Sequence, residues 1–72
     1  MYKLTLINKA NIFDKRNIGE FKTVGSAINE AFAYIFCYGE KNCTELTTDY
    51  INAAVGVFIY QSEQWFVKIV EE

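Results

Sequence analysis

The sequence has 72 residues, which allows one domain at most, because chains usually divide at roughly 100–200 residues per domain. Its composition is 51% hydrophobic, 17% aromatic and 22% charged, with no proline, and this excludes disordered, collagen-like and low-complexity chains. Histidine is absent, so the commonest general base and metal ligand is missing. We therefore expect one folded domain over residues 1–72 that is not an enzyme and has no catalytic residues, cofactor or metal ion.

The formal net charge is −2, and the two signs are unevenly distributed. Residues 1–22 hold five basic and two acidic side chains, a net charge of +3, whereas residues 23–72 hold two basic and seven acidic side chains, a net charge of −5. An acidic C-terminal portion suits contact with a basic surface on another molecule.

The two cysteines and the apolar runs indicate a cellular compartment. Cys37 and Cys43 cannot complete a four-ligand zinc site with histidine, because the chain has none. The simplest interpretation is a pair of reduced thiols in a cytosolic protein. Residues 1–9 contain no apolar stretch long enough for a secretory signal, and the longest apolar run, 31–38, is far short of the roughly 20 residues that cross a bilayer. We expect a cytoplasmic protein without membrane contact.

The N-terminal part predicts a hairpin. Residues 2–7 alternate between Tyr, Leu and Leu on one face and more polar side chains on the other, which is typical of a half-buried strand. The polar stretch 8–17 is rich in Asn, Asp and Lys, so we expect a loop there. A second strand is predicted over residues 18–22, where the flanking charges of Glu20 and Lys22 favour an exposed edge.

A helix is predicted next. Thr23 or Ser26 can cap its first turn, since each hydroxyl can accept a hydrogen bond from a backbone N–H two or three residues later. Apolar residues then recur at spacings of three and four and define its core stripe: Ile28, Ala31, Phe32, Ile35 and Phe36. Gly39 ends the helix, because glycine tolerates a left-handed conformation at little cost.

The C-terminal part predicts a second hairpin. Residues 55–60 and 65–70 are β-branched and aromatic, and polar residues separate them. With Ser62 and Glu63 at the tip, or in a four-residue loop with the same pairing, Tyr60 faces Trp65 and Phe58 faces Val67. Before this hairpin, Thr47-Thr48-Asp49 offers an N-cap, so residues 47–54 are interpreted as a short helix, or alternatively as a loop.

The assembled prediction is a small α+β domain with the order β-β-α-(short α)-β-β, in which the main helix packs on one face of a four-stranded antiparallel sheet. One such helix covers only one sheet face. Both faces of the last hairpin are nevertheless apolar, and the second face has Lys68 as its only polar member. In an antiparallel sheet with one face in water, the strands normally alternate apolar and polar residues. The last hairpin lacks this alternation, so we expect an uncovered apolar surface that takes part in an interaction.

The first functional hypothesis is a small protein-binding module that inhibits or regulates another protein by occupying its surface. A phage or mobile-element inhibitor of a host nucleic-acid enzyme or defence system fits this description. Tyrosines anchor interfaces and acidic residues steer encounter with basic targets. The predicted partner-binding residues are Tyr34, Tyr38, Tyr50, Glu30, Glu40, Glu45 and Asp49, although the tyrosines equally well complete the core.

Two alternatives remain open. The first is a homodimeric structural or regulatory protein whose uncovered sheet faces pair through Phe58, Trp65 or Phe66. The second is a weak nucleic-acid-binding protein that uses the basic N-terminal segment, although the net charge argues against it. The candidate nucleic-acid residues are Lys3, Lys9, Lys15, Arg16 and Lys22.

Overall fold

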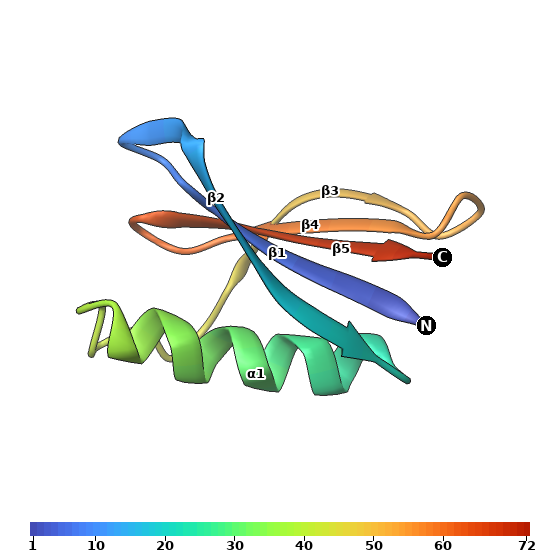
Figure 1. Ribbon diagram of the computed structural model, residues 1–72, viewed down its shortest axis with the longest axis horizontal. Helices are drawn as coiled ribbons and strands as arrows, with labels where there is room; N and C mark the ends of the chain where they lie inside the picture. The colour runs from blue at the N-terminus through green and yellow to red at the C-terminus, as the bar shows by residue number, and fades with distance from the viewer.

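A computed structural model describes all residues from 1 to 72. Its elements in chain order are β1 (Tyr2–Asn8), β2 (Asn11–Phe21), α1 (Val24–Cys37), β3 (Thr47–Asn52), β4 (Val57–Gln61) and β5 (Trp65–Glu71). The strands form one antiparallel sheet in the order β2-β1-β5-β4-β3, and α1 lies across one face (Figure 1). The α+β architecture with one helix on an antiparallel sheet is confirmed, but the predicted four strands are wrong because the sheet has five.

The additional strand is β3, in the segment for which a short helix was predicted. Thr47-Thr48-Asp49 can cap a helix, but threonine, tyrosine and isoleucine also favour strands, and pairing with β4 selects the strand. The alanines that follow lie in the turn to β4 rather than in a helix. Gly56 closes this turn with φ +69°, and a Cβ atom there would lie 2.5 Å from the Cβ of Glu71. Only glycine fits that conformation and that close approach.

The first hairpin is longer than predicted. Most of the expected loop over residues 8–17 belongs to β2, and the connection between β1 and β2 is only Lys9-Ala10. The turn-favouring side chains are satisfied locally, because Asn8 Oδ1 accepts from the Ala10 backbone N–H at 2.9 Å and Asn11 Oδ1 accepts from the Phe13 N–H at 3.2 Å. The ladder continues past them with two register shifts. Polar composition alone therefore misplaced the loop.

The helix begins and ends as predicted. The Thr23 hydroxyl accepts a hydrogen bond from the Ser26 backbone N–H at 3.1 Å, and Gly39 follows the helix with φ +108°. The buried stripe is rotated from the predicted one, since Ala27, Ala31 and Ile35 are fully buried whereas Phe36 is 54% exposed. Small alanines at four-residue spacing allow α1 to lie close to the sheet, and this places the phenylalanine outside the contact.

The β4–β5 hairpin has the predicted faces but a register shifted by two residues. Tyr60 faces Val67 and Phe58 faces Ile69, rather than Trp65 and Val67 respectively. A shift of two residues keeps each side chain on its face, because side chains alternate with period two. Ser62 closes the three-residue loop 62–64: its backbone N–H donates to the Trp65 carbonyl at 2.8 Å, and its Oγ accepts from the Trp65 N–H at 3.1 Å.

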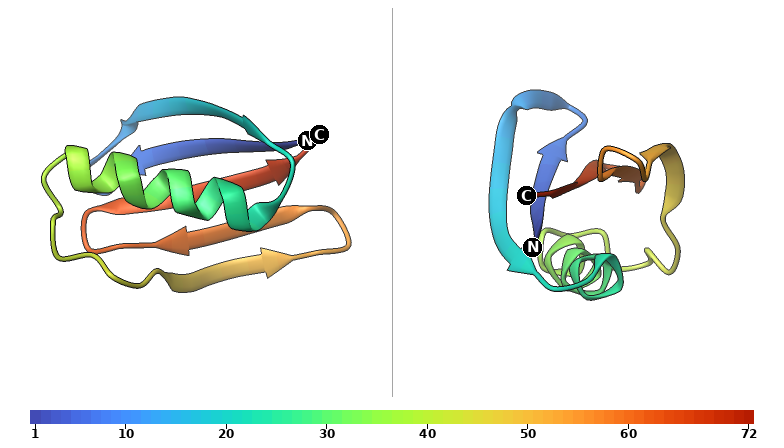
Figure 2. Two further views of the ribbon diagram at one scale, coloured as in Figure 1. Left: turned by 90° about the horizontal axis from the view of Figure 1, so that it is seen from below. Right: turned by 90° about the vertical axis from the view of Figure 1, so that its right-hand side faces the viewer.

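The hydrophobic core lies between α1 and the two strands β1 and β5. It consists of eight buried side chains: Leu4, Leu6, Ala27, Ala31, Ile35, Trp65, Val67 and Ile69. The strands β1 and β5, which pair with each other, supply all five strand residues of this core. The same pairing brings the two chain ends together, as Figure 2 shows, and the Glu72 backbone N–H donates to the Met1 carbonyl at 2.9 Å.

Candidate functional site

The sheet face that points away from α1 carries apolar side chains and is not covered by another element, and we call it the open face. Strands direct alternate side chains to opposite faces. Leu6, Val67 and Ile69 point toward α1 and are fully buried, so their neighbours along each strand lie on the open face. Five apolar members of the open face are half-buried: Ile7, Val57, Ile59, Phe66 and Val70.

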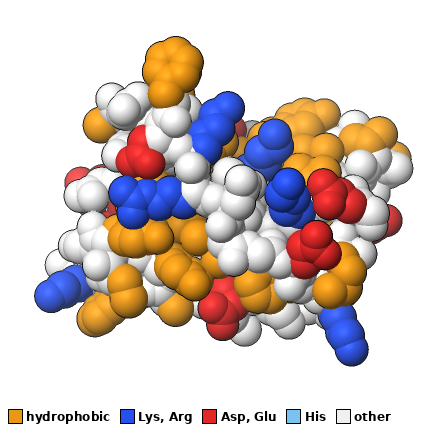
Figure 3. Space-filling model, in the orientation of Figure 1, with side chains coloured by type: hydrophobic (Ala, Val, Ile, Leu, Met, Phe, Trp, Pro, Cys, Tyr) orange, Lys and Arg blue, Asp and Glu red, His pale blue; other side chains and the backbone are white.

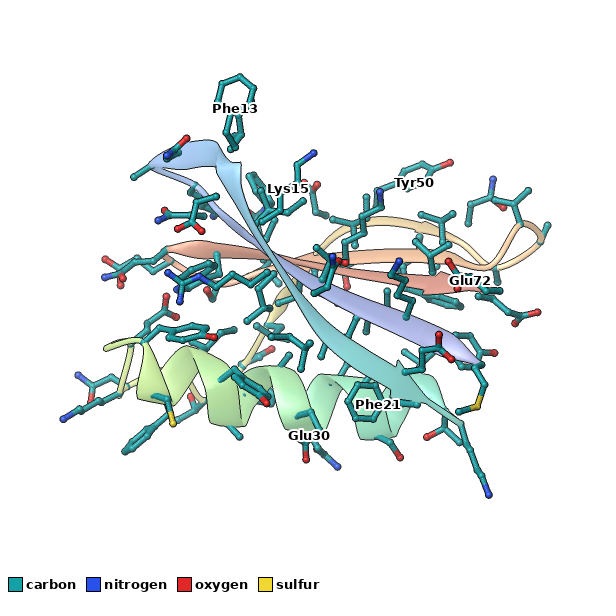
Figure 4. The ribbon with its side chains drawn as sticks, viewed as in Figure 1. Phe13, Lys15, Phe21, Glu30, Tyr50 and Glu72 are labelled. Carbon is teal, nitrogen blue, oxygen red and sulfur yellow. The ribbon has the colours of Figure 1, made fainter.

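Cross-strand pairing arranges the open face in rows. Thr5 of β1 lies opposite Lys68 of β5, which lies opposite Ile59 of β4, and the row ends at Tyr50 of β3. The β1–β2 hairpin tip rises on this side of the sheet, away from α1 (Figure 1). Phe13 at that tip, 89% exposed, and Tyr50, 50% exposed, both project to the side opposite α1 (Figure 4). Exposed aromatic side chains therefore flank the half-buried apolar centre.

Three lysines gather on the part of the open face formed by β2, β1 and β5. They line a shallow depression of about 360 Å³, which we call the lysine groove and whose lining residues are Lys3, Thr5, Ile7, Lys15, Asn17, Lys68, Val70 and Glu72. Figure 3 shows basic side chains gathered there, beside a hydrophobic area. Three of the eight lining residues are basic and one is acidic, and none of the lysines forms an ion pair, because Arg16–Asp14 is the only ion pair in the structure.

Lys9 lies between this groove and β4 and is already engaged. Its Nζ donates to Gln61 Oε1 at 2.7 Å and lies 5.1 Å from the centre of the Phe66 ring. Both contacts fix the ammonium over the ring, and a cation in that position is attracted by the face of the aromatic system. One face of Phe66 is therefore covered by the chain itself.

The seven residues predicted to bind a partner do not form one surface. Tyr50 lies on the side of the open face, whereas Glu30 lies below α1 on the opposite side of the molecule (Figure 4). Tyr34 follows Glu30 by one helical turn and is 36% exposed. Glu45 is exposed in the connector after α1, and Asp49 is exposed at the irregularity in β3. The structure thus keeps Tyr34 beside Tyr38, 6.1 Å between ring centres, and beside Glu30 on α1, whereas Tyr50 lies on the other side of the sheet.

Tyr38 completes the core rather than a surface. Its ring lies 5.2 Å from the Trp65 ring, centre to centre. The Arg16 guanidinium lies over the Tyr38 ring, 4.3 Å from the ring centre. Arg16 is held by Asp14, which also accepts from Asn8 Nδ2 at 3.3 Å. The Arg16 and Asn8 hydrogen bonds lower the pKa of Asp14. This group closes the end of the core around the tryptophan.

Glu40 has a structural role in the β4–β5 loop. Its Oε1 accepts from the Gln64 backbone N–H at 2.8 Å and from the Ser62 hydroxyl at 3.0 Å. Partial burial acts to raise the pKa of Glu40, but the hydrogen bonds from Gln64, Cys43 and Ser62 outweigh it, so the pKa is lowered. Burial, followed by the Glu40 carboxylate, raises the pKa of the Cys43 thiol. The carboxylate is committed to holding the loop.

The three residues predicted for self-association divide between the two faces. Trp65 is 4% exposed and lies in the core, so it presents no surface to a second chain. Phe58 lies on the side of α1, packs against the core and contacts Tyr2 edge-on at 6.1 Å between ring centres. Of the three, only Phe66 lies on the open face.

The residues predicted to bind nucleic acid are also dispersed. Lys15 and Lys3 lie on the open face, but Arg16 points to the side of α1 and packs against aromatic rings. Lys9 is engaged by Gln61, and Lys22 lies beyond the end of β2. The sequence prediction missed the grouping with Lys68. The alternation of side chains within each strand predicts which face of the sheet Lys3 and Lys68 occupy. Only the pairing of β1 with β5 places the two lysines next to each other.

The structure has neither a cluster of metal-ligating side chains nor a disulfide bond. No group of three or more Cys, Asp or Glu side chains is placed to hold a metal ion. Cys37 and Cys43 are unpaired, the first exposed and the second half-buried. α1 is the only helix, and with 14 residues it is not long and apolar enough to cross a membrane.

Comparisons of the chain with models of protein families, with curated proteins and with solved structures found no match. The geometry of the open face is therefore the basis for a functional proposal.

Proposed function

We propose that this protein is a non-enzymatic binding module that occupies a surface of another protein through its open face. The observation that carries the proposal is the row of apolar side chains on the sheet face that α1 leaves uncovered: Ile7, Val57, Ile59, Phe66 and Val70. Large apolar patches on a small soluble chain are typical of interaction sites. A module of this kind acts by excluding other molecules from the surface it covers, as an inhibitor or regulator does.

The charges on the open face favour a foreign partner over a second copy. In a symmetric dimer the same patch meets itself, so face-to-face docking would bring Lys3, Lys15 and Lys68 toward their own counterparts. Like charges repel most strongly when water is removed around them. We therefore expect the isolated protein to remain an 8.3 kDa monomer at micromolar concentration.

The test compares two single variants with matched charge. Ile59→Glu places a carboxylate at the centre of the open face, opposite Lys68. Ala33→Glu places one on the exposed side of α1. Both variants are first checked for native circular dichroism and for the emission of Trp65, the only tryptophan. A partner captured from the source cells by the wild-type chain is then purified and titrated calorimetrically with all three proteins.

We expect the wild-type chain and Ala33→Glu to bind this partner equally and Ile59→Glu to lose binding. Binding that survives Ile59→Glu but is lost with Ala33→Glu would place the interface on α1 and refute the proposal. A stable dimer of the isolated chain that Ile59→Glu dissociates would refute it in favour of self-association.

A further inference from the structure

We infer that the partner inserts carboxylate side chains into the lysine groove, so that the open face recognises an acidic protein surface with apolar residues beside it. This inference rests on the proposed function and adds the chemistry of the partner. It reverses the expectation from the acidic C-terminal half of the chain, which pointed to a basic target.

The first argument is the arrangement of the lysines. Thr5 pairs with Lys68, so Lys3 and Lys68 are diagonal neighbours on adjacent strands, about 7–8 Å apart by the geometry of antiparallel pairs. Lys15 lies on the other side of β1, opposite Ile7. None of the three has an acidic side chain within ion-pair distance. Like charges gathered on one face repel one another in the isolated fold, Glu72 and Glu20 at the edge of the groove offset this repulsion only in part, and carboxylates from a partner would offset the rest.

The second argument is the floor between the lysines. Ile7 and Val70 line the groove together with Thr5 and Asn17, and Ile59 continues the apolar floor on β4 next to Lys68. Thr5 Oγ1 and Asn17 Oδ1 are 3.1 Å apart and hydrogen-bonded to each other, so their polar groups are partly satisfied. Aliphatic side chains flanked by cations match a protein surface that presents leucine-like residues between carboxylates.

The same features argue against nucleic acid as the ligand. Single-stranded nucleic acid is bound through free aromatic faces on which bases stack, but no aromatic side chain lines the groove, and Lys9 covers one face of Phe66 on the same sheet face. A phosphate backbone that continued along the groove would also meet Glu72, which lines it, and Glu20, which pairs with Lys3 in the ladder.

The experiment uses two double variants with the same change in net charge. Lys15→Gln/Lys68→Gln removes two cations from the groove. Lys22→Gln/Lys41→Gln removes two exposed cations outside it, and it is the matched control. Each protein is titrated, at low and moderate salt, with a short peptide that alternates glutamate and leucine, with its lysine–leucine counterpart, and with single-stranded oligothymidylate. Backbone amide shifts locate the binding site on the wild-type chain.

We expect the glutamate–leucine peptide to shift amides of β1, β2 and β5, and its affinity to fall about tenfold in the groove variant and little in the control, because each exposed ion pair contributes modestly. Tighter binding of oligothymidylate than of the acidic peptide would overturn the inference in favour of nucleic acid. Equal affinity of both double variants for the acidic peptide would also overturn it.

Titrating the captured partner with Ile59→Glu and with the two double variants separates this inference from the proposed function. Loss of partner binding in Ile59→Glu with no loss in Lys15→Gln/Lys68→Gln would leave the open face as the interface and refute the acidic partner. Partner binding that weakens in the groove variant, but not in the control, supports both.

Discussion

The two faces of the sheet have similar apolar content and different environments. On the side of α1, Leu6, Val67 and Ile69 are sealed beneath Ala31 and its neighbours, and even the one tryptophan is 4% exposed. On the open face, aliphatic residues of the same strands remain half-buried, and lysines without acidic partners lie among them. One face is built to hold the chain together, whereas the other retains apolar surface that this chain does not cover.

This difference shows why burial, rather than residue type, separates structural from functional surface in so small a protein. A chain of this length buries only about 60% of the surface that its unfolded form exposes. Each apolar residue left uncovered is therefore a notable loss of stabilisation. We interpret its retention on the open face as the consequence of a binding role.

The largest expected effect comes from truncating matched isoleucines on the two faces. Ile69→Ala should reduce the free energy of unfolding by about 2–5 kcal/mol, because it creates a cavity in the core. Ile59→Ala, on the adjacent strand but on the open face, should cost less, about 1–2 kcal/mol, since Ile59 is only partly removed from water in the isolated fold. Urea unfolding followed by Trp65 emission measures both. Equal costs would show that the two faces are equally buried in solution.

A smaller effect is expected from two consecutive cations on β2. Arg16 points to the side of α1 and covers Tyr38 and Trp65, 4.3 and 5.3 Å from the two ring centres. Lys15 points to the open face. We expect Arg16→Gln to lower the unfolding midpoint by less than Ile69→Ala does, and Lys15→Gln to leave the midpoint unchanged or raise it slightly. A larger loss for Lys15→Gln would mean that the open-face lysines have a structural role.

The smallest expected effect is the pH-dependent contribution of the Glu40 carboxylate, which holds the β4–β5 loop, to the free energy of unfolding. The pKa of Glu40 is lowered below its ordinary value of 4.5, so its stabilising effect is present above that value and is lost as the pH falls through the lowered pKa. Glu40→Gln should remove this acid-dependent loss, at most about 1 kcal/mol because the group is partly exposed and screened. Thermal melts across the acidic range measure it. An unchanged pH profile in the variant would exclude Glu40 as a source.

Local signals predicted the parts of the fold that depend on neighbouring residues. The Thr23 cap and the glycine after α1 are confirmed, because capping and left-handed geometry involve only a few adjacent positions. The faces of β4 and β5 are also correct, although the register is shifted by two residues. Alternation determines the face of a residue without determining its partner.

Non-local pairing decided what the sequence could not. Thr47-Thr48-Asp49 is compatible with a helix cap and with a strand, and only the contact with β4 distinguishes them. The lysine groove is a stronger case, since Lys3 and Lys68 are far apart in the chain and meet only because β1 pairs with β5. The alternation of residues within β1 or within β5 does not indicate that these two strands are neighbours in the sheet.

The most direct test of the central claim is the solvent exposure of isoleucine methyl groups, measured by their relaxation enhancement with a soluble paramagnetic agent, in the isolated protein and in the complex with its partner. We predict a measurable enhancement for Ile59, which is half-buried, and none for Ile69, which is fully buried, in the isolated protein, with the Ile59 enhancement lost in the complex. An Ile59 methyl that is already protected in the isolated chain, or that remains exposed in the complex, would contradict the account.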